Sequence, residues 1–195
     1  MSLIASSSTI ALIMFTFLVP QKPGAVRRPT APETFRAQAK AASDAGLAGA
    51  AYVDIHIDKY SPDAERDAML ATLKSGGYAA LLDAIKKAPA IGTVKVGTET
   101  FVVRWARQQR SGENRRTISI VTDKPMLFVG GGQANAKPRE GYDIAVVQFD
   151  MDDAGVGSGT MAAAAKIKPG GPNGFQIDDY ADQPIKLVSI SRSLS

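Results

Sequence analysis

Along most of the chain, hydrophobic and polar residues alternate one by one, which is the pattern of half-buried β-strands. The strongest example lies within residues 50–60, where Val53, Ile55 and Ile57 share one face of a predicted strand. Residues 33–41 alternate in the same way, with small apolar residues on one face. Further strand-like segments lie at 93–97, 99–109, 115–123, 126–131, 142–152, 158–168, 175–180 and 184–191.

One segment, residues 61–89, has helical spacing instead. Pro62 suits the first helical position, and we expect the Ser61 hydroxyl to cap the first turn. Gly76-Gly77 then ends a first helix, because glycine adopts the left-handed closing conformation without strain. A second short helix follows and ends at Pro89. Both apolar stripes are typical of helices that pack on a sheet.

These patterns predict a mainly β (α+β) fold. We expect an antiparallel meander of about eight or nine strands, either a barrel or a sandwich, with one inserted pair of helices at about 62–88. Short turns between successive strands favour antiparallel neighbours. Residues 33–191 are expected to form a single β-rich domain, preceded by a proline-containing linker at 26–32.

The first 25 residues have the pattern of an export signal. The run 10–19 (IALIMFTFLV) is ten residues long, which suits a signal-peptide core and is too short to span a bilayer. We therefore expect an exported protein, periplasmic or secreted, with no stable membrane span in the mature chain. An uncleaved anchor and a misplaced start codon are the competing interpretations.

Composition narrows the possible chemistry. The 195 residues contain no cysteine, which excludes disulfides, thiolate metal sites and cysteine nucleophiles. The net charge of +4 comes from 23 Lys and Arg against 19 Asp and Glu, and this small surplus does not indicate a nucleic-acid partner. No motif indicates a cofactor.

A resemblance rests on two long runs of sequence. The run YSPDAERDAMLATLKSGGYAALLDAIKK, and FDMDDAGVGSGTMAAAAKIK followed by ADQPIKLVSI, resemble a group of exported bacterial proteins, mainly from soil bacteria, for which no function is known. The resemblance covers most of residues 33–191. It implies export and a β-rich fold, and it implies no catalytic residues.

The only histidine, His56, lies on a predicted strand between Asp54 and Asp58, all on one face. Carboxylates and an imidazole could hold a divalent metal or form an acid–base pair. The three residues span about 13 Å, since each strand residue rises about 3.3 Å, so they do not converge on one ion without a bend. A solvated polar strand face is therefore the favoured interpretation.

A second candidate region combines an arginine-rich hairpin with a glycine-rich loop. Alternation places Trp105 on the same face as Phe101 and Val103, toward the core, and five arginines surround it in the hairpin. The loop at 130–141 lacks the helix of a phosphate-binding loop, but such loops often carry binding residues. The candidate ligand-binding residues are Trp105, Arg107, Lys137 and Arg139.

Together these features favour a non-catalytic protein that binds a small molecule or an envelope component. A hydrolase-type or metal-dependent enzyme that uses Asp54, His56 and Asp58 is the alternative. A structural surface module that self-associates is a third possibility.

The export signal leads to a direct prediction. When the chain is expressed in a bacterium with an active export pathway, we expect the recovered protein to lack about the first 25 residues. The intact mass of the purified protein reads this directly. A full-length mass in the exported fraction would contradict the signal assignment.

Overall fold

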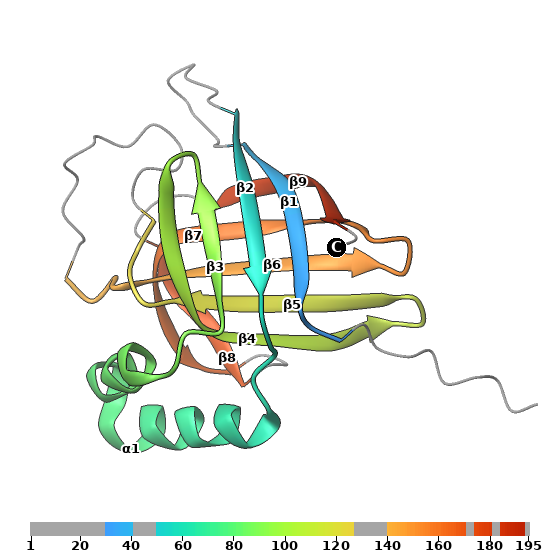
Figure 1. The fold of residues 1–195 in the computed structure, drawn as a ribbon. Coiled ribbons are helices and arrows are strands. Elements are labelled where there is room, and N and C mark those ends of the chain that lie inside the picture. Colours follow the sequence, from blue (N-terminus) through green and yellow to red (C-terminus); the bar gives the residue numbers. More distant parts are fainter. Residues whose placement is uncertain (1–29, 41–49, 127–139, 171–173, 181–183, 194–195) are drawn as a thin grey trace, which may run out of the picture.

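The computed structural model describes residues 30–40, 50–126, 140–170, 174–180 and 184–193 (Figure 1). Within them the chain forms nine strands and one long helix. In chain order these are β1 (Glu33–Lys40), β2 (Ala50–Ile57), α1 (Asp63–Lys87), β3 (Gly92–Val96), β4 (Glu99–Gly112), β5 (Arg115–Thr122), β6 (Ile144–Asp152), β7 (Val156–Pro169), β8 (Phe175–Tyr180) and β9 (Ile185–Ser193).

Eight of the strands close into an antiparallel barrel. Strands β1 to β7 pair in sequence order, and β9 then lies between β7 and β1 and completes the circle. The mainly β prediction is confirmed, and the structure decides for the barrel over the sandwich. Closure leaves no free edge in the barrel wall.

Strand β7 pairs with β6 along one side and with two different strands along the other. Its first half, from Val156 to Met161, pairs with β9 inside the barrel wall, whereas its second half, from Ala165 to Pro169, pairs with β8. Strand β8 therefore extends the sheet outside the barrel. This extension, together with α1, forms a second layer against one side of the barrel (Figure 1).

The barrel interior is filled by apolar side chains from all eight barrel strands. Phe35 and Phe149 meet edge to face at its centre, with ring centroids 5.2 Å apart. The alternation expected for β1 and β2 is confirmed, because Phe35 and Ile55 are both fully buried. An eight-stranded barrel is just wide enough for side chains of this size to fill it.

The helix α1 is broken at Gly77, as the glycine pair predicts. Gly77 has φ 71° and ψ −169°, a conformation that only glycine adopts without strain, and the helix changes direction there. Both halves bury apolar residues against the outer wall of the barrel, including Leu73 and Leu81. They form an outer core that is separate from the barrel interior.

The start of α1 differs from the prediction. The helix begins at Asp63, Pro62 holds the capping position, and no side chain caps the first turn. The Ser61 hydroxyl instead accepts a hydrogen bond from the backbone N–H of Ala106, and Ser61 N–H donates to Ala106 O at 2.7 Å. Ser61 therefore attaches the helix to β4 rather than capping it.

A helix that crosses a bilayer needs about 20 mostly apolar residues. No helix in the described residues meets this requirement.

Candidate functional site

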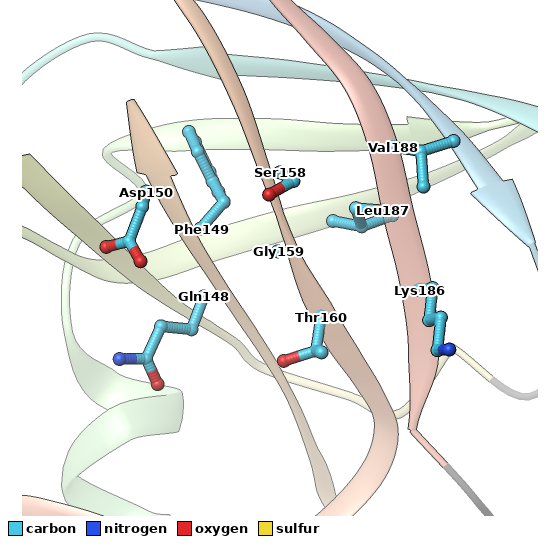
Figure 2. Close-up of a pocket in the computed structure, with 9 residues that line it drawn as sticks. All are labelled: Gln148, Phe149, Asp150, Ser158, Gly159, Thr160, Lys186, Leu187 and Val188. Atoms are coloured by element: carbon cyan, nitrogen blue, oxygen red, sulfur yellow. The ribbon is translucent and has the colours of Figure 1, made fainter. Parts of the chain in front are cut away.

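An open groove lies on the outer wall of the barrel, where β6, β7 and β9 run side by side (Figure 2). Its volume is about 450 Å³. Its lining is polar on the solvent side and apolar beneath. The lining residues are Gln148, Phe149, Asp150, Ser158, Gly159, Thr160, Lys186, Leu187 and Val188.

The strand register brings the polar lining together. Gln148 on β6 pairs with Thr160 on β7, and Thr160 pairs in turn with Lys186 on β9. One row further on, Asp150 pairs with Ser158. Because side chains directly opposite each other on neighbouring strands point to the same face, all five project outward. An amide, a carboxylate, two hydroxyls and an ammonium group thus share one surface.

Two glycines allow β6 and β7 to approach closely beneath this surface. A Cβ on Gly157 would lie 2.1 Å from Asp150 O, and a Cβ on Gly159 would lie 2.2 Å from Gln148 O. Real Cβ atoms do not approach backbone oxygens so closely, so a larger residue would force the strands apart. The glycines therefore maintain the shape of the groove floor.

A β-bulge in β9 directly follows the groove residue Val188. Ser189 has φ 51°, and the pairing of β9 shifts by one residue at this point relative to both β1 and β7. The extra residue turns Ile190 into the barrel, although strict alternation from Leu187 would place it outside, and Lys186 and Val188 lie on the groove side. Bulges and strained non-glycine residues of this kind are frequent beside functional sites.

At the opposite rim, Asp150 is oriented by its neighbour. The hydroxyl of Thr117 on β5 donates a hydrogen bond to Asp150 Oδ1. The carboxylate is exposed and can accept further hydrogen bonds from a ligand. The groove therefore has an acceptor at one side and a cation at the other.

The predicted ligand residue Trp105 lies elsewhere. A bulge between Val103 and Trp105 puts the indole on the outer face of β4, under α1, while Phe101 and Val103 point into the barrel. The prediction that the three share a face is therefore wrong. Trp105 is 3% exposed and packs edge to face on Phe175, so the ring belongs to the outer core.

Of the other three predicted ligand residues, the described part of the chain contains Arg107. Arg107 pairs with Asp63 at 2.9 Å, at the start of α1. Lys137 and Arg139 lie outside the described residues, so their role stays a prediction.

The arginines of the β4–β5 hairpin point in different directions. Arg104 donates to Asp123 and to Ala88 O, whereas Arg116 turns into the barrel end. The arginines of this hairpin therefore contact separate partners and do not form one surface cluster.

The strand face of Asp54, His56 and Asp58 lies on the outside of the barrel. Asp54 is held by Arg36 through two hydrogen bonds of 2.7 and 3.1 Å, and the hydrogen bond from Arg36 lowers the pKa of Asp54. His56 Nε2 lies 3.1 Å from Asp58 Oδ1, and His56 Nδ1 lies 2.9 Å from Thr34 Oγ1. Among the described residues, no three carboxylate or histidine side chains are grouped closely enough to hold a metal ion.

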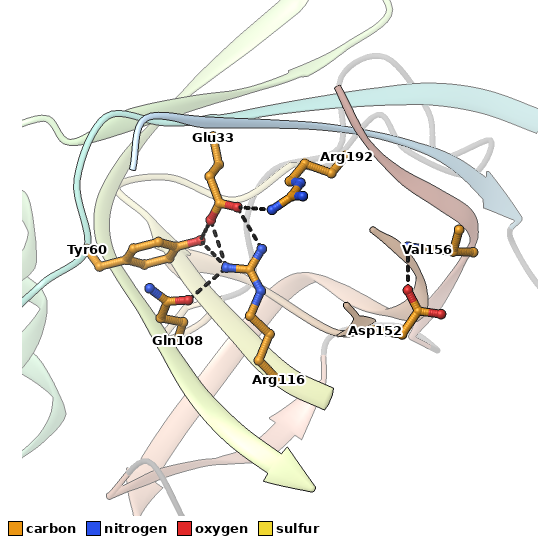
Figure 3. Close-up of polar contacts among 7 residues, drawn as sticks. All are labelled: Glu33, Tyr60, Gln108, Arg116, Asp152, Val156 and Arg192. Carbon is orange, nitrogen blue, oxygen red and sulfur yellow. Dashed lines mark hydrogen bonds and ion pairs between the residues drawn. The ribbon is translucent and has the colours of Figure 1, made fainter. Parts of the chain in front are cut away.

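A buried polar cluster closes the barrel end where β1 and β5 begin (Figure 3). Arg116 donates to both carboxylate oxygens of Glu33, at 2.7 and 2.8 Å, and the Tyr60 hydroxyl donates to Glu33 Oε2 at 2.5 Å. Arg116 also donates to Gln108, and Arg192 lies 3.5 Å from Glu33 Oε1. The carboxylate is satisfied by the protein itself, so the cluster is structural rather than a ligand site.

The cluster shifts the pKa values of Glu33 and Tyr60. Burial pushes the pKa of Glu33 upward, but the hydrogen bonds from Arg116 and Tyr60 and the nearby arginine charges outweigh burial and lower the pKa below the ordinary value of a glutamate. Burial, followed by the hydrogen bond to Glu33, raises the pKa of Tyr60. Glu33 is therefore ionised and Tyr60 protonated at neutral pH.

Sequence reasoning missed the groove residues Gln148, Thr160 and Lys186. Alternation does place them on a polar face, and the glycines at 157 and 159 are a signal of close strand approach. The pairing of β7 with β9 brings Thr160 next to Lys186. No pattern within either strand predicts this pairing.

The Glu33–Arg116 pair leads to a stability prediction. Glu33→Gln leaves a buried guanidinium without its counter-charge, so we expect the free energy of unfolding at pH 7 to fall by about 3–5 kcal/mol. Urea unfolding measures it, with the exposed Glu99→Gln as control. A loss below about 1 kcal/mol, which is typical of exposed pairs, would contradict a buried pair.

The same pair predicts a pH dependence. Since the pKa of Glu33 is lower in the folded state, its stabilisation is present above the unfolded value of about 4.3 and is lost as pH falls through the folded value. The wild type should therefore lose more stability below pH 4 than Glu33→Gln does. Equal losses of unfolding free energy below pH 4 in the wild type and in Glu33→Gln would contradict this.

Comparisons with known proteins provide no relative for this chain: no family model, no curated protein and no solved structure matches it. The resemblance to exported bacterial proteins therefore stays a prediction. The function is inferred from the groove and its neighbouring residues alone.

Proposed function

We propose that this protein is a non-catalytic binding module that holds a small polar molecule in the groove formed by β6, β7 and β9. The observation that carries the proposal is the groove itself, about 450 Å³ in volume. This falls within the range of small-molecule sites, which combine a concave shape with a few well-placed polar groups.

The packing of the barrel supports a site on the outer wall. Large apolar side chains such as Phe35 and Phe149 occupy the barrel centre, and the cluster around Glu33 and Arg116 occupies one end. The groove, by contrast, lies on the outer face of β6, β7 and β9 and presents exposed polar groups such as those of Thr160 and Lys186. A rigid barrel wall holds these groups in place with little loss of entropy on binding.

The setting we propose is the bacterial envelope or the extracellular space. The signal-like run at 10–19 and the absence of cysteine are compatible with export. In that setting the ligand would be a small solute or a component of the envelope. No enzymatic step is needed for this role.

We expect ligands of this groove to shift the amide resonances of β6, β7 and β9. Mixtures of sugars, amino acids and organic acids, titrated into ¹⁵N-labelled protein, provide the measurement.

Thr160→Val removes one hydroxyl at nearly constant volume and should weaken binding by about tenfold, since one hydrogen bond contributes about 1.5 kcal/mol. Thr100→Val, on the exposed outer face of β4, is the matched control. Shifts confined to other surfaces, or equal affinities for both variants, would contradict the proposal.

One contact favours a second candidate function, a hydrolase. A carboxylate only accepts hydrogen bonds, so the contact with Asp58 places the proton of neutral His56 on Nε2. Nδ1 then faces the Thr34 hydroxyl as an acceptor. A hydroxyl, an imidazole and a carboxylate in line is the arrangement that activates a nucleophile in triad enzymes.

The hydrolase candidate predicts that the chain cleaves an activated ester, such as p-nitrophenyl acetate, and that His56→Ala reduces the rate to that of buffer. His56 is the only histidine, so no other imidazole can replace it. Asp54→Asn is the control, because Asp54 is engaged by Arg36 and not by His56. Equal rates for the wild type and His56→Ala would exclude this function.

A further inference from the structure

Two lysines face each other beside the groove. Lys186 on the groove rim pairs directly with Lys40 on β1, and both are exposed. Like charges directly opposite each other on neighbouring strands repel. No hydrogen bond or ion pair joins either ammonium group to a described residue. The barrel thus holds two positive charges side by side, and the described residues supply no counter-charge for them.

Other outer-wall cations are paired differently. Arg36, two strand rows away on β1, forms an ion pair with Asp54 at 2.7 Å, and Lys95 on β3 lies opposite the same carboxylate. Lys168 pairs with Asp178 on β8 at 2.8 Å. Against this background the Lys40–Lys186 pair is a local excess of positive charge.

The excess lies at the end of a row of hydrogen-bond donors. The cross-strand pairs Gln148–Thr160, Thr160–Lys186 and Lys186–Lys40 form one line across β6, β7, β9 and β1. Each of the four side chains can donate a hydrogen bond. Neighbouring strands are about 4.8 Å apart, so the line is about 14 Å long. Strand β1 runs beside β9 at the edge of Figure 2.

We propose that the groove binds a small polyhydroxylated molecule with one anionic group, a phosphate or a carboxylate. The anion lies between the Lys40 and Lys186 ammonium groups and relieves their repulsion. The hydroxyl groups lie along Thr160 and Gln148, and Asp150 accepts a hydrogen bond from one of them. This assignment rests on the proposed binding function and specifies its ligand class.

The position of Asp150 limits the ligand to one anionic group. Its carboxylate stands one row from the donor line and pairs with Ser158, on the side of the groove away from Lys40. A second anionic group at that end would be repelled, whereas a hydroxyl would donate to it. The groove therefore distinguishes the two ends of the ligand.

The test uses three probes of similar size: glucose 6-phosphate, glucuronate and glucose. Each is titrated into the ¹⁵N-labelled protein at low ionic strength, and amide shifts on β7 and β9 are followed. We expect both anions to bind at least tenfold more tightly than glucose. The two anions together distinguish a phosphate site from a general anion site.

The variants Lys186→Gln and Lys40→Gln should each weaken anion binding at least fivefold. Lys95→Gln makes the same charge change on another outer strand and should leave the affinity unchanged. The amide spectra of all three variants report whether the barrel is intact.

A second measurement is the melting temperature in phosphate and in chloride at equal ionic strength. The rise in melting temperature in phosphate should be smaller in Lys186→Gln than in the wild type, and unchanged in Lys95→Gln.

Three outcomes would overturn the assignment. If glucose binds the groove as tightly as the anions, the anion site fails while the proposed binding function stands. If Lys95→Gln weakens binding as much as Lys186→Gln, the effect is one of net charge rather than of this pair. If neither anion shifts the groove amides, the ligand class is wrong, and the mixture titration with Thr160→Val decides separately on the proposed function.

Discussion

The structure depends on the insertion of β9 between β1 and β7. This backbone ladder joins the last strand to the first and converts a row of hairpins into a closed barrel. Closure satisfies the hydrogen-bonding groups at both edges of the sheet and encloses one apolar interior. Without it, β1 and β7 would each present an open edge, and the inward side chains of Phe35 and Phe149 would lose their enclosure.

The same insertion creates the groove. The outward residues of β7 and β9 share a surface because the two strands are neighbours, and the bulge at Ser189 turns the following residue, Ile190, into the barrel. Beneath that surface, Gly157 and Gly159 let β7 approach the backbone of β6. Fold and candidate site therefore share one cause, which is the way the barrel closes.

Charge is arranged differently at the barrel end and on the groove wall. At the end, Glu33, Arg116 and Tyr60 satisfy one another out of water, which is the arrangement expected of a structural cluster. On the wall, Lys40 and Lys186 stand in solvent without a described counter-charge. A group that the protein itself satisfies contributes to stability, whereas an unsatisfied group in a groove is available to a ligand. This contrast is why the groove, and not the more elaborate cluster, is the candidate site.

Local pattern determined the kinds of element in this protein and most of their inward faces. The alternation of Val53, Ile55 and Ile57 and the break at Gly77 follow from periodicity and from backbone sterics, which act between near neighbours in the chain. Tertiary structure alone decided between a barrel and a sandwich, because closure depends on a pairing between β1 and β9 that neither strand specifies.

Tertiary structure also decided where the alternation of inward and outward residues breaks down. Trp105 and Ile190 lie on the opposite faces from those that alternation predicts. In β4 and in β9, a bulge of one extra residue exchanges the inward and outward positions that follow it. A bulge is held by the strands on either side of it, so it is not visible in the strand that contains it. The contact between Glu33 and Arg116, 83 residues apart, and that between Thr160 and Lys186 likewise arise from which strands become neighbours. The sequence by itself thus determined the elements, and the closed barrel decided which side chains meet.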